Sequence, residues 1–183
     1  GKRIAYIAYL SSTAPLGVYL VNSTGIQLAN VATAPVRPAT APDADSFHIA
    51  WSTSGNYIAF VAALEGNGIA TGLHTARADG TQMHTVFEAA NGGVLSLAWA
   101  PAGDTVAYLS SNAVELWRTN VANAYANGVF APAYIAGAVT NYTWSGDGAA
   151  LAYVSAGPAV SVVTRYTLAT SSYRTISSST WAS

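Results

Sequence analysis

The chain has 183 residues, of which 51% are hydrophobic and only 8% are charged, and its formal net charge is −1. Its seven basic residues do not form the clustered basic face that neutralises phosphates, which excludes nucleic acid as a partner. The absence of cysteine excludes disulfide bonds, thiolate nucleophiles and cysteine-ligated zinc.

The first predicted element is a strand within the apolar run Ile4 to Leu10. A basic pair followed by an apolar run imitates a signal peptide, but this run is short and its triplet Ile4-Ala5-Tyr6 recurs later. A hairpin follows, with a strand at Val18 to Asn22, a turn at Gly25 and a returning strand at Ile26 to Val31. No apolar stretch reaches the roughly 18 residues that cross a bilayer, so we expect no membrane span.

Three later segments superimpose closely. In each of them a Trp precedes, by seven residues, a triplet made of an aliphatic residue, an alanine and an aromatic residue. The pairs are Trp51 with Ile58-Ala59-Phe60, Trp99 with Val106-Ala107-Tyr108, and Trp144 with Leu151-Ala152-Tyr153. Alternating polarity before the Trp predicts a strand, and the triplet opens the next one. Between them Gly55, Gly103 or Gly148 would supply the positive φ of a tight turn.

A second hairpin follows each triplet. It is clearest at Leu73 to Ala78, the turn Asp79-Gly80, and Thr81 to Phe87. Four strands in about 46 residues are close to the ~40–45 residues of a four-stranded propeller blade. We therefore predict an all-β protein, a single β-propeller domain over residues 1–183. Its four four-stranded blade repeats are expected at about 1–45, 46–92, 93–138 and 139–177.

The two ends of the chain are complementary. The first repeat enters the triplet Ile4-Ala5-Tyr6 without a Trp strand, while residues 178–183 supply a surplus strand around Thr180 and Trp181. We predict that residues 178–183 complete the first blade. The candidate assembly positions would then be Ile4, Ala5, Tyr6, Thr180 and Trp181. The ring would close within one chain, close between two chains as eight blades, or remain open as a filament of strand-donating copies. A piece of a longer repeat array is the remaining alternative.

The repeat resembles those of TolB-like and WD-type propellers, whose blades read roughly Trp-Ser-Pro-Asp-Gly, then a strand, then a hairpin closed by Asp-Gly. Trp99-Ala100-Pro101 with Gly103, and Trp144-Ser145 with Asp147-Gly148, carry the likeness best. It departs at Thr53 and Gly146, where the family favours Pro. Because TolB-like proteins are periplasmic interaction platforms, the resemblance implies an extracytoplasmic, bacterial-type scaffold. The weakly charged composition favours the same location.

Residues Val121 to Gly137 form an insertion that carries three aromatic residues, Tyr125, Phe130 and Tyr134. Aromatic side chains often anchor a protein partner. They would equally cover the outer edge of a blade. The sequence leaves both alternatives open.

The three histidines, His48, His74 and His84, are the only conventional general bases near neutral pH. His74 and His84 lie almost symmetrically about Asp79-Gly80 and are candidates to face each other across the hairpin. Two ligands are fewer than the three that a zinc site takes from the protein. We therefore predict no catalytic residue, no metal site and no cofactor.

The leading functional hypothesis is a non-enzymatic, extracytoplasmic β-propeller scaffold that mediates protein–protein interaction. The first alternative is a self-assembling fibre or layer subunit, a homo-oligomer joined by strand exchange between the termini. The second is a hydrolase or lyase at the channel mouth, which the few carboxylates disfavour.

Overall fold

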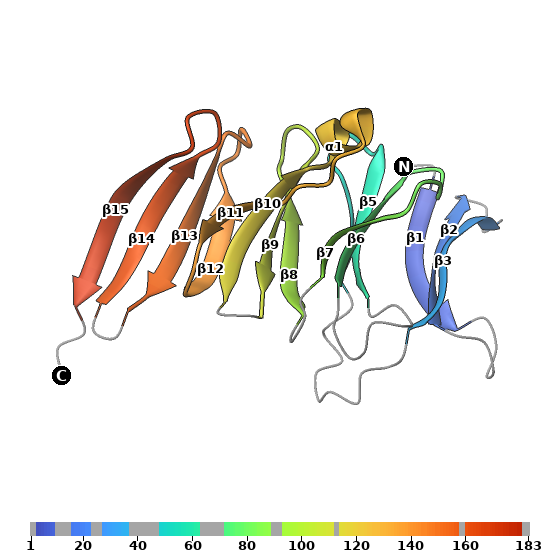
Figure 1. Cartoon of the computed structure of the whole chain (residues 1–183), viewed down its shortest axis with the longest axis horizontal. Helices are drawn as coiled ribbons and strands as arrows, with labels where there is room; N and C mark the ends of the chain where they lie inside the picture. The colour runs from blue at the N-terminus through green and yellow to red at the C-terminus, as the bar shows by residue number, and fades with distance from the viewer. Residues whose placement is uncertain are drawn as a thin grey trace.

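A computed structural model describes residues 3–9, 16–22, 27–36, 48–62, 72–88, 93–111, 114–157 and 160–180. Within these ranges the chain forms four antiparallel sheets in sequence order, which we call blades 1 to 4 (Figure 1). The prediction of an all-β chain of propeller-like blades is confirmed at this level.

Blade 1 has three strands in the order β1-β2-β3: β1 (Arg3–Tyr9), β2 (Leu16–Asn22) and β3 (Gln27–Val36). Blade 2 has the order β4-β5-β6-β7: β4 (Ile49–Trp51), β5 (Tyr57–Ala62), β6 (Gly72–Arg77) and β7 (His84–Glu88). Blade 3 has the order β8-β9-β10-β11: β8 (Val94–Trp99), β9 (Thr105–Ser110), β10 (Glu115–Asn120) and β11 (Ala133–Ala136). A helix, α1 (Val121–Asn127), separates β10 from β11. Blade 4 has the order β12-β13-β14-β15: β12 (Val139–Trp144), β13 (Ala150–Ala156), β14 (Val160–Thr167) and β15 (Ser172–Thr180).

The Trp-to-triplet spacing produces the predicted hairpin in blades 2, 3 and 4. Each Trp lies directly opposite the first residue of its triplet, as Trp51 does with Ile58. The turn glycines Gly55, Gly103 and Gly148 have φ values of 72°, 75° and 70°. These values fall where L-residues with a side chain are strained, which is why glycine recurs at this turn.

The Trp side chains join neighbouring blades. The indole Nε1 of Trp99 donates to the carbonyl oxygen of Ala50 at 3.1 Å, and that of Trp144 donates to Ala98 at 3.1 Å. Each bond runs from the first strand of one blade to the first strand of the blade before it. Trp99 and Trp144 therefore link neighbouring blades, and both are partly buried against the core between those blades.

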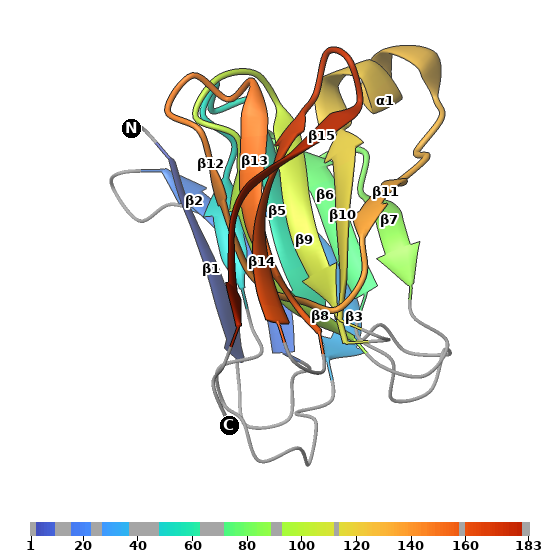
Figure 2. The same ribbon diagram turned by 90° about the vertical axis from the view of Figure 1, so that its left-hand side faces the viewer.

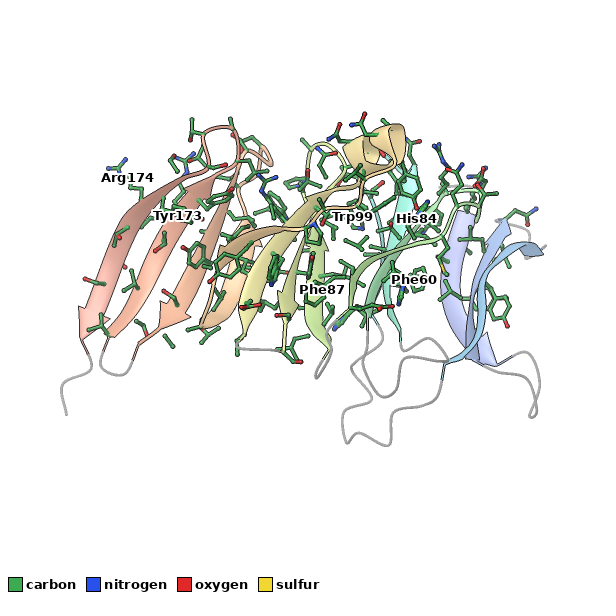
Figure 3. The ribbon with its side chains drawn as sticks, in the orientation of Figure 1. Phe60, His84, Phe87, Trp99, Tyr173 and Arg174 are labelled. Atoms are coloured by element: carbon green, nitrogen blue, oxygen red, sulfur yellow. The ribbon has the colours of Figure 1, made fainter. Side chains whose placement is uncertain are left out.

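The core lies between blades, because the strand period of two sends the triplet side chains to opposite faces. Between blades 2 and 3, Ala59 of β5 meets Val106 and Tyr108 of β9. Between blades 3 and 4, Ala107 of β9 meets Leu151 and Tyr153 of β13. The large members of each triplet thus face the preceding blade, and the alanine faces the following one. Figure 3 shows Phe60 on the blade 1 side of blade 2, and Phe87 and Trp99 between blades 2 and 3.

The four blades stand in an open row, with blade 1 and blade 4 at opposite ends (Figure 1). Viewed along the row, β1 and β12 lie on one side, and β7, β11 and α1 lie on the other (Figure 2). The structure therefore does not show the closure of a ring within one chain. Among the described residues β1 pairs only with β2, in agreement with the predicted lack of a Trp strand in the first repeat.

The predicted placement of residues 178–183 in the first blade needs a correction. Ser178 and Thr180 belong to β15 of blade 4, where they lie opposite Val162 and Val160 of β14. The reason is that the β14–β15 ladder resumes after a bulge at Val163/Thr164 and continues to the end of both strands. Trp181 lies outside the described residues.

Candidate functional site

Helix α1 is defined by its two ends. The side chain of Asn120 caps the N-terminus and accepts from the backbone N–H of Asn123 at 2.8 Å. Gly128 ends the helix in the left-handed conformation at φ 70°. No helix was predicted here, although an Asn cap before an alanine-containing run and a glycine after it are recognisable helix signals.

Two of the three predicted interaction aromatics from the insertion contact blade 2. The Tyr125 hydroxyl donates to the carbonyl oxygen of Gln82 at 2.7 Å, and its ring stacks on Tyr57 at a centroid distance of 5.0 Å. Phe130 stacks on His84 at 4.3 Å. Both side chains are half-buried, so in this structure they cover the outer part of a blade, the second of the two alternatives.

The third aromatic residue of the insertion remains accessible. Tyr134 on β11 is 51% exposed, and its ring meets Trp117 edge-on at 5.2 Å. Across the gap to blade 4, Tyr173 on β15 is 54% exposed, and its hydroxyl donates to the carbonyl oxygen of Ile135 at 3.0 Å. Tyr173 also packs on Tyr166 at 5.0 Å. We call Tyr134, Tyr166 and Tyr173 the tyrosine seam.

A pocket of about 260 Å³ lies beside the seam, between α1, β10 and β11. Three amides and one guanidinium give it its polar character, and small apolar residues complete its wall. The lining residues are Arg118, Thr119, Asn120, Asn123, Ala124, Asn127, Val129, Ala131 and Ala133. Arg118 is the only charged residue among them, so the pocket favours an anionic or acceptor-rich group.

Arg118 connects the pocket with the tyrosine seam. Its Nη2 donates to the Tyr166 hydroxyl at 3.4 Å, and its guanidinium carbon lies 5.8 Å from the centre of the Tyr166 ring. Its Nε is buried and has no hydrogen-bond partner among the described residues. Burial alone would raise the pKa of Tyr166. The hydrogen bonds with Ser171 and Arg118, and the charge of Arg118, outweigh burial and lower that pKa.

The predicted assembly residues of the termini lie apart. Ile4, Ala5 and Tyr6 are in β1 of blade 1, where Ile4 is 54% exposed and Tyr6 is half-buried against Tyr19. Thr180 ends β15 at the opposite end of the row, so the structure does not bring it to β1.

The interpretation that His74 faces His84 across their hairpin is wrong. His74 lies opposite Thr85, and His84 lies opposite Thr75. Because neighbouring positions in this ladder point to opposite faces, the two imidazoles lie on different sides of blade 2. His74 is buried against Phe60, and His84 stacks on the insertion. In the part of the chain that the structure describes, no three His, Cys, Asp or Glu side chains gather as metal ligands.

No family model and no curated protein matches this sequence. Solved structures do match the fold. A TolB from Agrobacterium tumefaciens superimposes with a TM-score of 0.56 and 15% identity over 98% of this chain and 62% of its own. TolB from Acinetobacter baumannii gives 0.54 and 14% over 96% of this chain and 41% of its own. The chain has a TolB-like β-propeller fold.

The match covers less than two thirds of either TolB chain. A prolyl endopeptidase structure also superimposes, with a TM-score of 0.60 and 14% identity over 96% of this chain and 26% of the enzyme. At such identities the TolB-like fold is shared by proteins of different activity, so function has to be argued from residues. Seven-residue α1 is too short to cross a membrane, and the described ranges hold no helix that could.

Proposed function

We propose that this TolB-like chain is a non-enzymatic, extracytoplasmic scaffold that binds a protein partner at the tyrosine seam and its pocket. The observation that carries the proposal is the placement of two half-exposed tyrosines, Tyr134 and Tyr173, beside a pocket whose one charge is Arg118. Tyrosine and arginine are enriched at the residues that dominate binding energy in protein interfaces. The likeness to TolB structures supports the extracytoplasmic location.

The pocket adds a chemical preference. A carboxylate would pair with the Arg118 guanidinium and accept from the amides of Asn120, Asn123 and Asn127, which line the same space. The described lining residues contain no acid to repel it. The preferred partner therefore presents an Asp, a Glu or a C-terminal carboxylate beside an apolar surface that covers the tyrosines.

A peptide array tests this proposal. We expect the chain to bind acidic peptides, and the affinity to fall at least tenfold when Asp and Glu in the peptide are replaced by Asn and Gln. The Arg118→Gln variant should bind the acidic and the amide peptides equally. Tyr134→Ala and Tyr173→Ala should weaken binding of all these peptides. Leu95→Ala is the control, because Leu95 is also half-exposed, at 51%, but lies on the first strand of blade 3. Equal binding of acidic and amide peptides would contradict the proposal.

The non-enzymatic part of the proposal has its own measurement. We expect no turnover of peptide or glycan panels. Turnover that is lost in His48→Ala would replace the scaffold with the hydrolase or lyase alternative.

A further inference from the structure

The internal blade contacts show what each face of a blade packs against. The large members of the triplets, which face the preceding blade, are fully enclosed: Ile58, Phe60, Val106 and Tyr108 are 0% exposed. The triplet alanines of blades 2 and 3, which face the following blade, are also 0% exposed. Contact between a large-residue face and an alanine face therefore repeats at two junctions, that of blades 2 and 3 and that of blades 3 and 4.

Blade 1 carries a large-residue face without a described blade in front of it. Ile4 occupies the position of Ile58 and Val106, yet it is 54% exposed. Tyr6 occupies the position of Phe60 and is half-buried, with its ring stacked on Tyr19 at 5.6 Å. Arg3, on the other face of β1, reaches blade 2 and donates to the carbonyl oxygen of Ala78 at 2.7 Å. Ile4 and Tyr6 therefore lie on the face turned away from the rest of the row. On this face Ile4 is accessible, whereas Tyr19, opposite Tyr6, is 3% exposed.

Blade 4 carries the matching alanine face at the other end of the row. Ala152 occupies the position of Ala107, but it remains half-exposed, and so does its neighbour Val154. Figure 3 shows Arg174 on this open side and Tyr173 on the side of blade 3.

One further residue of blade 4 repeats an interior contact residue. Arg165 lies opposite Ala152, as Arg118 lies opposite Ala107. Arg118 uses that position to reach Tyr166 of the next blade, whereas Arg165 is exposed.

We propose that these two faces pack on each other between copies of this chain, with blade 1 of one copy on blade 4 of the next. Such a contact would continue the interior junctions, with Ile4 and Tyr6 of one copy against Ala152 and Arg165 of another. It is heterologous, because the two surfaces differ, so the copies associate head to tail. A second copy is the occupant because both halves of the repeated contact already belong to this molecule.

Head-to-tail packing is distinct from the exchange of a terminal strand. It uses sheet faces on β1 and β13 and needs no residue beyond Thr180. It is also independent of the proposed function, because the tyrosine seam lies at the junction of blades 3 and 4. Loss of one activity therefore leaves the other unchanged.

Light scattering after size exclusion of the full chain tests the proposal with two variants, Ile4→Lys and Ala152→Lys, whose new charge is repelled by Arg165. Each places a charge on one end of the row and leaves the other end intact. We expect the wild type to form dimers or longer assemblies and each variant alone to be monomeric. An equimolar mixture of the two variants should form a two-chain complex and nothing larger, because only one productive contact remains between them.

Three controls keep the outcome decisive. Circular dichroism reports whether each variant keeps its sheets, and Leu95→Lys places the same charge on an exposed site away from both ends. A chain ending at Thr180 should still assemble. A monomeric wild type, a mixture that stays monomeric, or loss of assembly on that truncation would each overturn the proposal. The last of these would assign the contact to strand donation.

Discussion

At the scale of single residues, Tyr142 shows how one side chain links two blades. Its hydroxyl donates to the carbonyl oxygen of Ala107 at 3.2 Å, across the junction of blades 3 and 4. Ser96 donates to the same hydroxyl at 3.5 Å. Burial raises the pKa of Tyr142 to about 12, and the Ser96 hydroxyl opposes that rise only in part. The phenol therefore remains protonated in the folded chain at pH values where an unfolded tyrosine ionises.

This difference predicts a loss of stability in alkali. An unfolded tyrosine has a pKa of about 10, so between about pH 10 and pH 12 the folded state holds a proton that the unfolded state has released. The contribution of protonated Tyr142 to the free energy of unfolding is complete below pH 10 and is lost as the pH rises through 12. Urea unfolding should show the free energy falling by up to about 1.4 kcal/mol per pH unit for this group. Tyr142→Phe should flatten the fall, and identical slopes in both chains would contradict the prediction.

At the scale of elements, indole hydrogen bonds between first strands join blade 2 to blade 3 and blade 3 to blade 4. Trp99→Phe removes the bond from the indole to the carbonyl oxygen of Ala50 and keeps most of the ring packing. We expect it to lower the free energy of unfolding by about 0.5–1.5 kcal/mol, the usual net value of such a bond. Trp117→Phe is the matched control, because its indole donates to Glu115 of the same strand. A larger loss in the control would show that the bond between blades contributes little.

Helix α1 is an element held by its ends. Asn120→Ala removes the side chain that caps it and should destabilise it by about 1 kcal/mol. Hydrogen exchange at residues 121–128 should then accelerate severalfold, while β9 keeps its protection. Asn127→Ala is the control, since among the described residues its amide donates only to the Asn123 side chain, at 2.8 Å. Equal acceleration in both variants would mean that the cap does not hold the helix.

At the scale of the whole molecule, the blades could be predicted from the sequence because their signals are local. The spacing of Trp51 and Ile58 along the sequence determines a hairpin, and Gly55, with φ of 72°, determines its turn. The tyrosine seam could not be predicted, because Arg118 and Tyr166 meet only when two blades pack. The pocket was not predicted because helix α1, which forms one of its walls, was not expected. The residue at which β15 ends could not be predicted from the sequence either. A bulge decides its register, and no residue pattern marks that bulge.

The alternation of large residues and alanine along the triplets also bears on how the molecule melts. The junctions described above all join neighbouring blades, so an interior blade is held on two sides and a terminal blade on one. In such a linear array, stability is approximately a sum over units and their junctions. On heating, the terminal blades should therefore unfold before the interior blades. Consider two partners that bind the folded chain with equal affinity and do not bind the unfolded chain. The partner bound at a terminal blade would raise the melting temperature more than the partner bound at a middle blade.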